Sequence, residues 1–188
     1  DFGVREIFII DDVFNLSKKR VVEFCEGMIR KGFHKKLSWL CNVQVSRPVV
    51  DDALFGIMKR AGCWMIMPGF ESGDQRILDV IKKGITLEEA ARAVALARKA
   101  GLVVKGNFIL GHPTETKDSI ENTIRFAKKL KLHMAGFTMM LPLPGTELYE
   151  NAREYGSFDP MDFDSITFSG TGSAQVPFVP HGLDADYL

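Results

Sequence analysis

The 188-residue sequence contains only three cysteines, and they are not spaced as metal ligands. Cys25, Cys41 and Cys63 lie far apart, and no Cys-x-x-Cys or comparable spacing occurs. An odd number of dispersed cysteines opposes a disulfide framework and favours a reducing, cytoplasmic location. Cys41 is expected to be a small buried hydrophobic side chain. The sequence therefore shows no metal-cluster ligands of its own.

Long hydrophobic runs and an excess of one charge are also missing. No apolar run reaches the roughly 18 residues of a membrane span, and no signal peptide is visible. The 24 basic and 24 acidic residues cancel, which argues against nucleic-acid binding driven by overall charge. The phosphate-binding loop Gly-x-x-x-x-Gly-Lys, the nucleophile elbow Gly-x-Ser-x-Gly and the zinc motif His-Glu-x-x-His are absent.

What the sequence does contain is a repeated alternation of helix-like and strand-like runs. Gly32, Gly62 and Gly101 each end a helix-like run, and a looser joint without glycine lies near Lys131. A glycine just past a helix is the usual left-handed cap. Strands that alternate with helices predict parallel pairing through right-handed crossovers.

The predicted fold class is therefore α/β, a partial TIM-like barrel of about five parallel strands. The strands are expected at 6–10, 37–45, 63–67, 103–110 and about 135–141, with helix N-caps at Ser17, Thr86, Thr116 and Thr146. Residues 1–157 are expected to form the barrel. Residues 158–188 lack a clear period and are expected to form an irregular C-terminal extension.

Polar side chains stand at the ends of the predicted strands. They are Asp11 and Asp12 after the first strand, Asn42 and Gln44 near the end of the second, Glu71 and Ser72 after the third, and Asn107 and His112 at the fourth. In a parallel barrel these ends converge on one mouth, where active sites lie. For any one of these residues the alternative role is turn or cap chemistry, for which Asp, Ser and Asn are common.

Five sequence blocks, in order over about residues 5–157, resemble the radical S-adenosylmethionine (radical SAM) superfamily. They read IFIIDDVF, LSWLCNV, MKRAGCWMIMPGFESGDQRILDVIKKGIT, AGLVVKGNFILGHPTET and MMLPLPGTELYE. The likeness is greatest to the cobalamin-dependent branch, which includes the anaerobic magnesium-protoporphyrin monomethyl ester cyclase type. It implies a (β/α)6 core, of which this chain carries the family's second to sixth strands.

The resemblance implies an iron–sulfur oxidoreductase. In that family a [4Fe-4S] cluster, held by Cys-x-x-x-Cys-x-x-Cys after the first strand, reduces S-adenosylmethionine to a 5′-deoxyadenosyl radical that abstracts a substrate hydrogen. This chain lacks the cysteine triad and does not begin with Met. We therefore expect a fragment or processed product whose cluster ligands, and any cobalamin domain, lie upstream. The chain alone is expected to be inactive, and the sequence identifies neither a catalytic residue nor the substrate.

The resemblance also assigns nine residues to the binding of S-adenosylmethionine. They are Asp11 and Asp12 for the ammonium, Glu71 and Ser72 near the ribose and sulfonium, Lys83 for the carboxylate, Asn107 for the ribose hydroxyls, and Ile109, Leu110 and Gly111 along the adenine. A carboxylate or a strand-end carbonyl suits a cation, and glycine lets the backbone approach a ring. Without the resemblance, Lys83 would be a solvated lysine at a helix end, favoured there by the helix dipole.

The sequence departs from the family pattern at three places. One is His112, which lies at the predicted mouth and could touch substrate or serve as a turn residue. Gln44 and Ser46 replace an arginine and an aspartate that relatives often carry, which puts a role for that loop in doubt. Thr114 stands where relatives usually have glycine, and a β-branched residue is not expected to adopt a positive φ.

Two other functions fit parts of the sequence. A complete barrel enzyme could use Asp11, Glu71 and His112 in acid–base or metal chemistry, but five strands are too few to close a (β/α)8 barrel. A non-catalytic scaffold or binding module of degenerate radical SAM fold is the other alternative. A Cys-x-x-x-Cys-x-x-Cys encoded upstream of Asp1 would favour the enzyme.

Interaction partners follow from the same considerations. No membrane span and no nucleic-acid partner are expected. The first strand should form an exposed sheet edge, which predicts self-association, for example as a homodimer.

Overall fold

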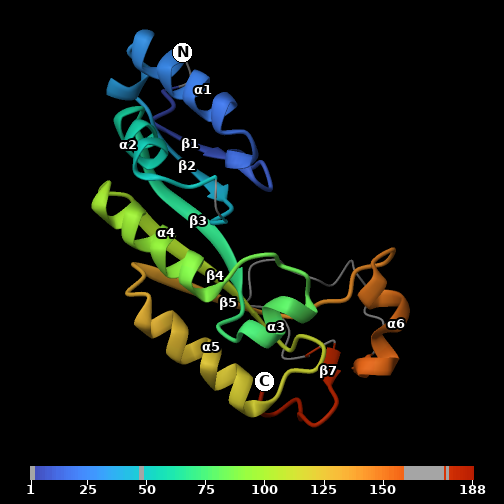
Figure 1. The fold of residues 1–188 in the computed structure, drawn as a ribbon. Helices are drawn as coiled ribbons and strands as arrows, with labels where there is room; N and C mark the ends of the chain where they lie inside the picture. The colour runs from blue at the N-terminus through green and yellow to red at the C-terminus, as the bar shows by residue number, and fades with distance from the viewer. Residues whose placement is uncertain (1–2, 47–48, 159–175, 177) are drawn as a thin grey trace. The chain divides into compact units, whose positions relative to one another are not determined.

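The structure is a computed structural model that describes residues 3–46, 49–158, 176 and 178–188 (Figure 1). Helices and strands alternate through most of the chain. The elements are β1 (Glu6–Ile9), η1 (Phe14–Leu16), α1 (Lys18–Arg30), η2 (Phe33–Lys35), β2 (Ser38–Val43), α2 (Asp52–Arg60), β3 (Cys63–Glu71), α3 (Gln75–Val80), α4 (Leu87–Lys99), β4 (Val103–Leu110), α5 (Lys117–Lys129), β5 (Met134–Met139), α6 (Glu147–Tyr155), β6 (Gly156–Phe158) and β7 (Phe178–Pro180).

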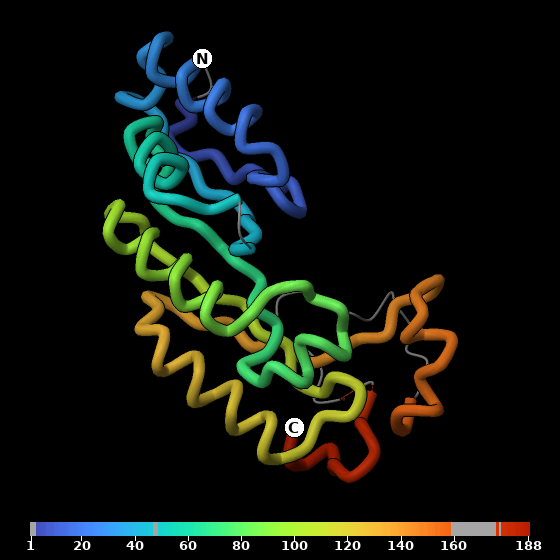
Figure 2. The backbone as a smooth tube through the Cα atoms, viewed as in Figure 1, coloured from blue at the N-terminus to red at the C-terminus, as the bar shows by residue number. Residues whose placement is uncertain are grey.

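The five longer strands form one sheet in the order β1-β2-β3-β4-β5. Strands β1 and β2 pair in parallel with Ile7 opposite Trp39, and β2 and β3 pair in parallel with Cys41 opposite Ile66. Figure 2 follows the chain from β1 through α1 to β2 and through α2 to β3. The predicted fold class, a partial barrel of about five parallel strands, is confirmed.

Strand β3 is longer than the sequence predicted. It was expected to end at Met67, but it continues through Pro68 and Gly69 to Glu71. Proline lacks an N–H and normally interrupts a strand. Here Pro68 pairs with Val43, the last residue of β2, so the missing donor falls where that ladder ends.

The chain divides into two compact units, and each is described by itself. The first comprises Asp1–Phe70, Gly84–Asn107 and Ala127–Gly136, and the second comprises Glu71–Lys83, Phe108–Phe126 and Phe137–Leu188. The division runs through β3, β4 and β5.

The core of the first unit is built around Trp39, which is completely buried on β2. Its Nε1 donates a 2.9 Å hydrogen bond to the Ala61 carbonyl. The rings of Phe14 and Phe24 meet it edge-on, with centroids 5.5 and 5.4 Å away. Because the indole N–H is satisfied inside the core, this large ring can be buried without a polar penalty.

Local signals in the sequence place the joints correctly. Gly32, Gly62 and Gly101 have φ of 71°, 97° and 78°, as left-handed caps require, and Lys131 takes φ 52° at the joint without a glycine. The four predicted N-caps each accept a backbone N–H: Ser17, Thr86, Thr116 and Thr146. These interactions are local in sequence, which is why the pattern predicted them.

In the second unit, β6 and β7 pair antiparallel, with Ser157 opposite Val179. The predicted boundary between a barrel in 1–157 and an extension in 158–188 stays a prediction, and 159–175 and 177 lie outside the described residues. Within the described part of the chain, no helix combines the length and apolarity that a membrane crossing requires.

Candidate functional site

An ion pair joins two of the predicted cofactor residues in the second unit. Glu71 is the last residue of β3, and its Oε1 accepts a 2.8 Å hydrogen bond from Lys83 Nζ. The two side chains are only 19% and 32% exposed. The Lys83 N–H donates to the Leu78 carbonyl, so the chain closes α3 and returns toward the end of β3. The structure therefore places one carboxylate and one ammonium together, partly shielded from water.

The loop after Glu71 is fastened to α5. Ser72 is fully buried, its Oγ lies 3.1 Å from Thr123 Oγ1, and it accepts a hydrogen bond from the Asp74 N–H. The Gly73 N–H also donates to Thr123 Oγ1, over 2.9 Å. The Ser72 hydroxyl is thus engaged inside the loop, and its role near the ribose stays a prediction.

His112 lies in the loop after β4 and is 98% buried, with 2% of its surface exposed. Neither ring nitrogen makes a hydrogen bond of standard length and angle. Burial lowers the pKa of His112 to about 4; a weak hydrogen bond with the Glu71 backbone opposes this effect, and the Lys83 charge adds to it. At neutral pH the imidazole is therefore uncharged.

Glu115 is a buried carboxyl group that the sequence reasoning missed. Its Oε2 accepts hydrogen bonds from the backbone N–H of Gly111 (2.6 Å) and of His112 (3.1 Å), while Oε1 has no partner. Burial raises the pKa of Glu115 to about 7, although the two N–H groups oppose that rise. Glu115 shapes the loop that carries Gly111 and His112. The sequence feature that could have indicated this role is the position of Glu115, four residues after Gly111, the glycine that follows β4.

Thr114 contradicts the expectation that it would avoid a positive φ, because its φ is 65°. The Arg76 guanidinium donates to Thr114 Oγ1 over 2.9 Å and to its carbonyl over 3.0 Å. This two-point contact holds the residue in a left-handed conformation that costs a β-branched side chain on the order of 1–3 kcal/mol. Glu71 has a positive φ as well, also 65°.

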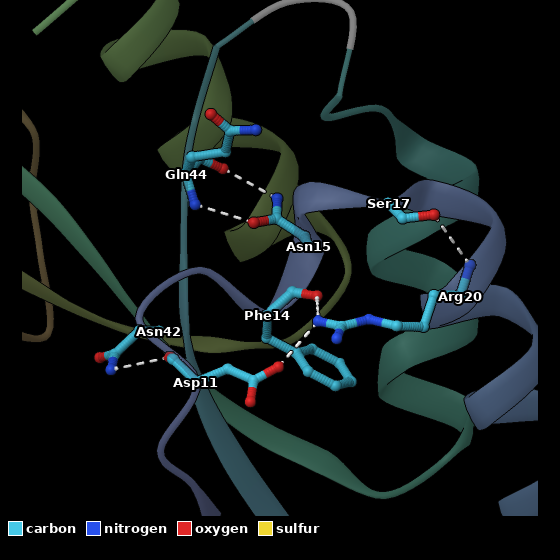
Figure 3. A network of polar contacts seen from close by, with 7 residues as sticks. All are labelled: Asp11, Phe14, Asn15, Ser17, Arg20, Asn42 and Gln44. Carbon is cyan, nitrogen blue, oxygen red and sulfur yellow. Dashed lines mark hydrogen bonds and ion pairs between the residues drawn. The ribbon is translucent and has the colours of Figure 1, made fainter.

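In the first unit, Asp11 follows β1 and is already paired. Its Oδ2 accepts a 2.8 Å hydrogen bond from Arg20 Nη2, and its carbonyl accepts one from Asn42 Nδ2 (Figure 3). Arg20 also donates to the Phe14 carbonyl. The carboxylate is about half-exposed, so a ligand ammonium would share it with Arg20. Asp12 is exposed beside it.

Asn15 ties the same loop to the end of β2. It is fully buried; its Nδ2 donates to the Gln44 carbonyl, and its Oδ1 accepts from the Gln44 N–H (Figure 3). The Asn15 side-chain amide thus makes the two hydrogen bonds with Gln44 that the backbone of a neighbouring strand would otherwise make.

The remaining predicted residues lie along β4. Asn107 is half-buried in the first unit, and its Oδ1 would lie 3.3 Å from a Cβ at Gly136, so the glycine leaves room for the amide. Ile109 and Leu110 are half-buried in the second unit, and Gly111 is buried with φ 86°. Their roles toward S-adenosylmethionine stay predictions.

The described residues do not fit an iron–sulfur cluster. No group of three or more His, Cys, Asp or Glu side chains is placed to hold a metal ion in the described ranges. Cys25, Cys41 and Cys63 are buried free thiols, and burial raises the pKa of Cys25 to about 12. Metal ligation needs thiolates, so these cysteines belong to the core.

A model of the Radical SAM superfamily matches residues 1–127. The chain is 37% identical over 172 residues to an uncharacterized methyltransferase of Pyrococcus horikoshii, a match that covers 86% of this chain and 37% of that protein. It is 32% identical over 168 residues to the anaerobic magnesium-protoporphyrin IX monomethyl ester cyclase of Cereibacter sphaeroides, covering 89% and 28%. The chain thus spans about a third of the length of these relatives.

Solved structures show the same fold. The radical S-adenosylmethionine methyltransferase TsrM from Kitasatospora setae, with cobalamin and a [4Fe-4S] cluster bound, superimposes with a TM-score of 0.70 at 21% identity. That match covers 98% of this chain and 37% of TsrM. At this identity the likeness concerns the fold.

Proposed function

The chain belongs to the radical SAM superfamily, and from this we propose that it is the S-adenosylmethionine-binding part of a radical SAM iron–sulfur enzyme. The observation that carries the proposal is the Glu71–Lys83 ion pair. The sequence resemblance assigned Glu71 to the ribose and sulfonium and Lys83 to the carboxylate of one cofactor, and the two side chains are in contact. A shielded pair of opposite charges suits a ligand that presents both a carboxylate and a sulfonium.

In the proposed complex, Lys83 binds the carboxylate of the cofactor and Glu71 binds the ribose hydroxyls near the sulfonium. Asp11 and the carbonyls of its loop receive the ammonium. Asn107 binds the ribose hydroxyls, and the segment 109–111 lines the adenine. When bound, S-adenosylmethionine supplies the 5′-deoxyadenosyl group that abstracts a substrate hydrogen.

The cluster ligands are proposed to come from residues outside this chain, since the described residues do not fit a cluster. Cobalamin is proposed as a further cofactor, because TsrM binds it. Relatives carry the names methyltransferase and cyclase. Methyl transfer is therefore proposed beside hydrogen abstraction, and oxidoreductase is the less precise description. The substrate is not assigned.

A degenerate, non-catalytic scaffold has less support. The relatives that the chain matches are named a methyltransferase and a cyclase, which favours an enzyme. A cytoplasmic location is proposed from the free thiols.

A homodimer through the edge of β1 is also proposed. β1 lies at one edge of the sheet, and Ile7 and Phe8 are 38% and 48% exposed. Exposed apolar edges favour pairing with another strand. Light scattering should show a dimer that Phe8→Lys converts to a monomer; a monomer at every concentration would contradict this proposal.

The main test is the affinity for S-adenosylmethionine, measured on the full-length protein with a reconstituted cluster. Lys83→Ala and Glu71→Ala should each weaken binding about tenfold, the loss of one charge-assisted hydrogen bond. Lys82→Ala is the matched control, because Lys82 pairs with Glu147 on the surface and its side chain is 76% exposed. Unchanged affinity in both Glu71→Ala and Lys83→Ala would overturn the assigned roles.

A further inference from the structure

The basic residues of this chain gather in the first unit. Over the whole sequence, 24 basic residues balance 24 acidic ones. Basic residues nevertheless outnumber acidic residues in the first unit, and acidic residues outnumber basic ones in the second. The balance of charge that argued against a nucleic-acid partner is therefore an average over two units of opposite sign. An asymmetry of this kind favours a charged partner for one of the units.

The excess of basic residues lies where four helices end. Helices α1, α2, α4 and α5 each end in, or are followed by, a run rich in lysine and arginine. We call these runs together the basic edge, which comprises residues 30–36, 59–60, 98–99 and 128–131. The basic edge contains no acidic residue, and all of its lysines and arginines are exposed. All four segments belong to the first unit.

Backbone contacts join the first three segments of the basic edge. A Cβ on Gly62, just after α2, would lie 3.5 Å from the His34 Cα, so the end of α2 packs against η2. A Cβ on Gly101, just after α4, would lie 3.6 Å from the Lys59 Cε. The ends of α1, α2 and α4 are therefore neighbours.

A hydrogen bond adds the fourth segment. The Arg98 Nη1, at the end of α4, donates to the Lys131 carbonyl over 2.7 Å. Neighbouring helices pack about 8–10 Å apart, so four adjacent helix ends form an extended strip of positive charge. A strip of this form matches a linear polyanion better than it matches a single small anion.

The helix dipole accounts for only part of this charge. Each helix C-terminus carries about half a negative charge, which favours lysine and arginine in the last turn. Lys31, Lys36 and Lys131 follow α1 and α5 and do not belong to their last turns. Within the described residues, Lys99 is the one member of the basic edge in an ion pair, with Asp52 over 2.9 Å. Most of the positive charge is therefore free to bind a partner.

An exposed aromatic ring indicates which polyanion fits. Phe33 is 45% exposed in the middle of segment 30–36, whereas Leu130, the other large apolar residue of the basic edge, is 7% exposed. Binding to a membrane surface uses a broad apolar face beside the basic residues, and one ring does not supply it. Single-stranded nucleic acid presents phosphates to a basic surface and bases to an aromatic ring.

We propose that the basic edge binds single-stranded nucleic acid. Its lysines and arginines contact the phosphates, and Phe33 stacks on a base. RNA and DNA share this chemistry. The inference goes beyond the proposed function, because it gives the chain a macromolecular partner and does not depend on the Glu71–Lys83 pair.

The first test measures the affinity of the full-length protein for labelled single strands of RNA and DNA, each of about 20 nucleotides, by fluorescence anisotropy. Lys35→Glu combined with Lys36→Glu should weaken binding at least about tenfold at about 0.15 M salt. It should also make the slope of log K against log salt shallower by about 1.4, the value for two lost phosphate contacts.

The matched control is Lys19→Glu combined with Arg153→Glu. Both residues are exposed and lie outside the basic edge, and the two replacements change the net charge by the same amount. This control should bind the strands within about threefold of the parent. Because the replaced side chains in both double variants are exposed, the unfolding temperatures should equal that of the parent.

The second test separates stacking from charge. Phe33→Ala should weaken binding to both strands about tenfold while leaving the salt slope unchanged. On a strand of the same length without bases, Phe33→Ala should bind as tightly as the parent. An equal loss on the strand with bases and the strand without them would overturn the stacking role and, with it, the assignment to single-stranded nucleic acid.

The remaining outcomes are equally decisive. A parent that binds neither strand, or a control variant that loses as much affinity as Lys35→Glu with Lys36→Glu, overturns the proposal. Tighter binding to phosphatidylserine vesicles or to polyglutamate than to either strand assigns the basic edge to a membrane or to an acidic protein, and also overturns it. A preference for RNA or for DNA with the expected variant effects supports it and identifies the source. Affinity for S-adenosylmethionine should be unchanged in Lys35→Glu with Lys36→Glu, so failure here leaves the proposed function standing.

Discussion

Lys83 donates a 2.8 Å hydrogen bond to Glu71, so the residue that ends β3 is paired with one that lies twelve positions later in the chain. The six-residue helix α3 lies between them, and its short length makes the return possible. The pair holds a positive and a negative group side by side at a strand end. In parallel α/β folds, strand ends are where ligands bind.

The Glu71–Lys83 pair should contribute measurably to stability. A double-mutant cycle with Glu71→Gln and Lys83→Met, followed by urea unfolding, should give a coupling energy of about 1 kcal/mol. The matched cycle on Lys82 and Glu147, which are 76% and 77% exposed, should give less than about 0.5 kcal/mol because water screens that pair. Equal coupling in the two cycles would mean that shielding plays no part.

Gly73→Ala should destabilise the protein by about 2 kcal/mol or more. A Cβ on Gly73 would lie 2.5 Å from the Phe126 Cβ and 2.7 Å from the Thr123 Cα, so the loop would have to move away from α5. Gly27→Ala on α1 is the control; its new Cβ meets nothing closer than 4.0 Å, and it should stabilise by about 0.5–1 kcal/mol. The free energy of unfolding in urea measures both, and an unaffected Gly73→Ala protein would contradict the packing.

Stability should depend on pH through two opposing groups. Burial raises the pKa of Glu115 from 4.5 to about 7. The stabilising contribution of Glu115 to the free energy of unfolding is therefore fully present below pH 4.5 and is lost as the pH rises to 7. Burial lowers the pKa of His112 from 6.5 to about 4, so its contribution is present above pH 6.5 and is lost as the pH falls to 4. Between these limits the two effects offset each other.

Single replacements should expose each group. In His112→Leu, where only Glu115 of the two remains, the free energy of unfolding should fall as the pH is raised from 4.5 to 7. In Glu115→Gln, where only His112 remains, it should rise as the pH is raised from 4 to 6.5. The other charged groups that act on the two residues, Asp74, Arg76 and Lys83, are unchanged in both variants. Urea unfolding at a series of pH values measures the slopes, and slopes of the same sign would refute the assignment.

Asn15→Leu should destabilise the protein by about 2–3 kcal/mol. The buried amide satisfies both the N–H and the carbonyl of Gln44, and leucine would leave two backbone groups without partners. Asn151→Ala is the control, because the Asn151 side chain donates an exposed hydrogen bond to the Glu147 carbonyl within α6. That variant should remain within about 0.5 kcal/mol of the parent. Thermal or urea unfolding of the two variants decides the matter.

Much of the fold could be predicted because its signals are local. The glycine joints and the Thr86 N-cap depend on residues three or four positions apart, and the structure has them as predicted. The alternation of strands and helices likewise selected a parallel sheet, since each strand and helix carries its own periodicity. Membership of the radical SAM superfamily followed from ordered blocks of residues and is confirmed.

The sequence by itself thus determined the order of the five sheet strands and of the helices between them, their caps and the family. Tertiary structure alone decided the contacts, backbone conformation and burial of the candidate site residues. It placed Lys83 on Glu71, engaged Ser72 with Thr123, gave Thr114 a left-handed backbone and buried Glu115 and His112. The physical reason is that a positive φ at a β-branched residue and a shifted pKa both depend on neighbours distant in sequence, such as Arg76 for Thr114. Burial and those neighbours exist only once the chain has folded.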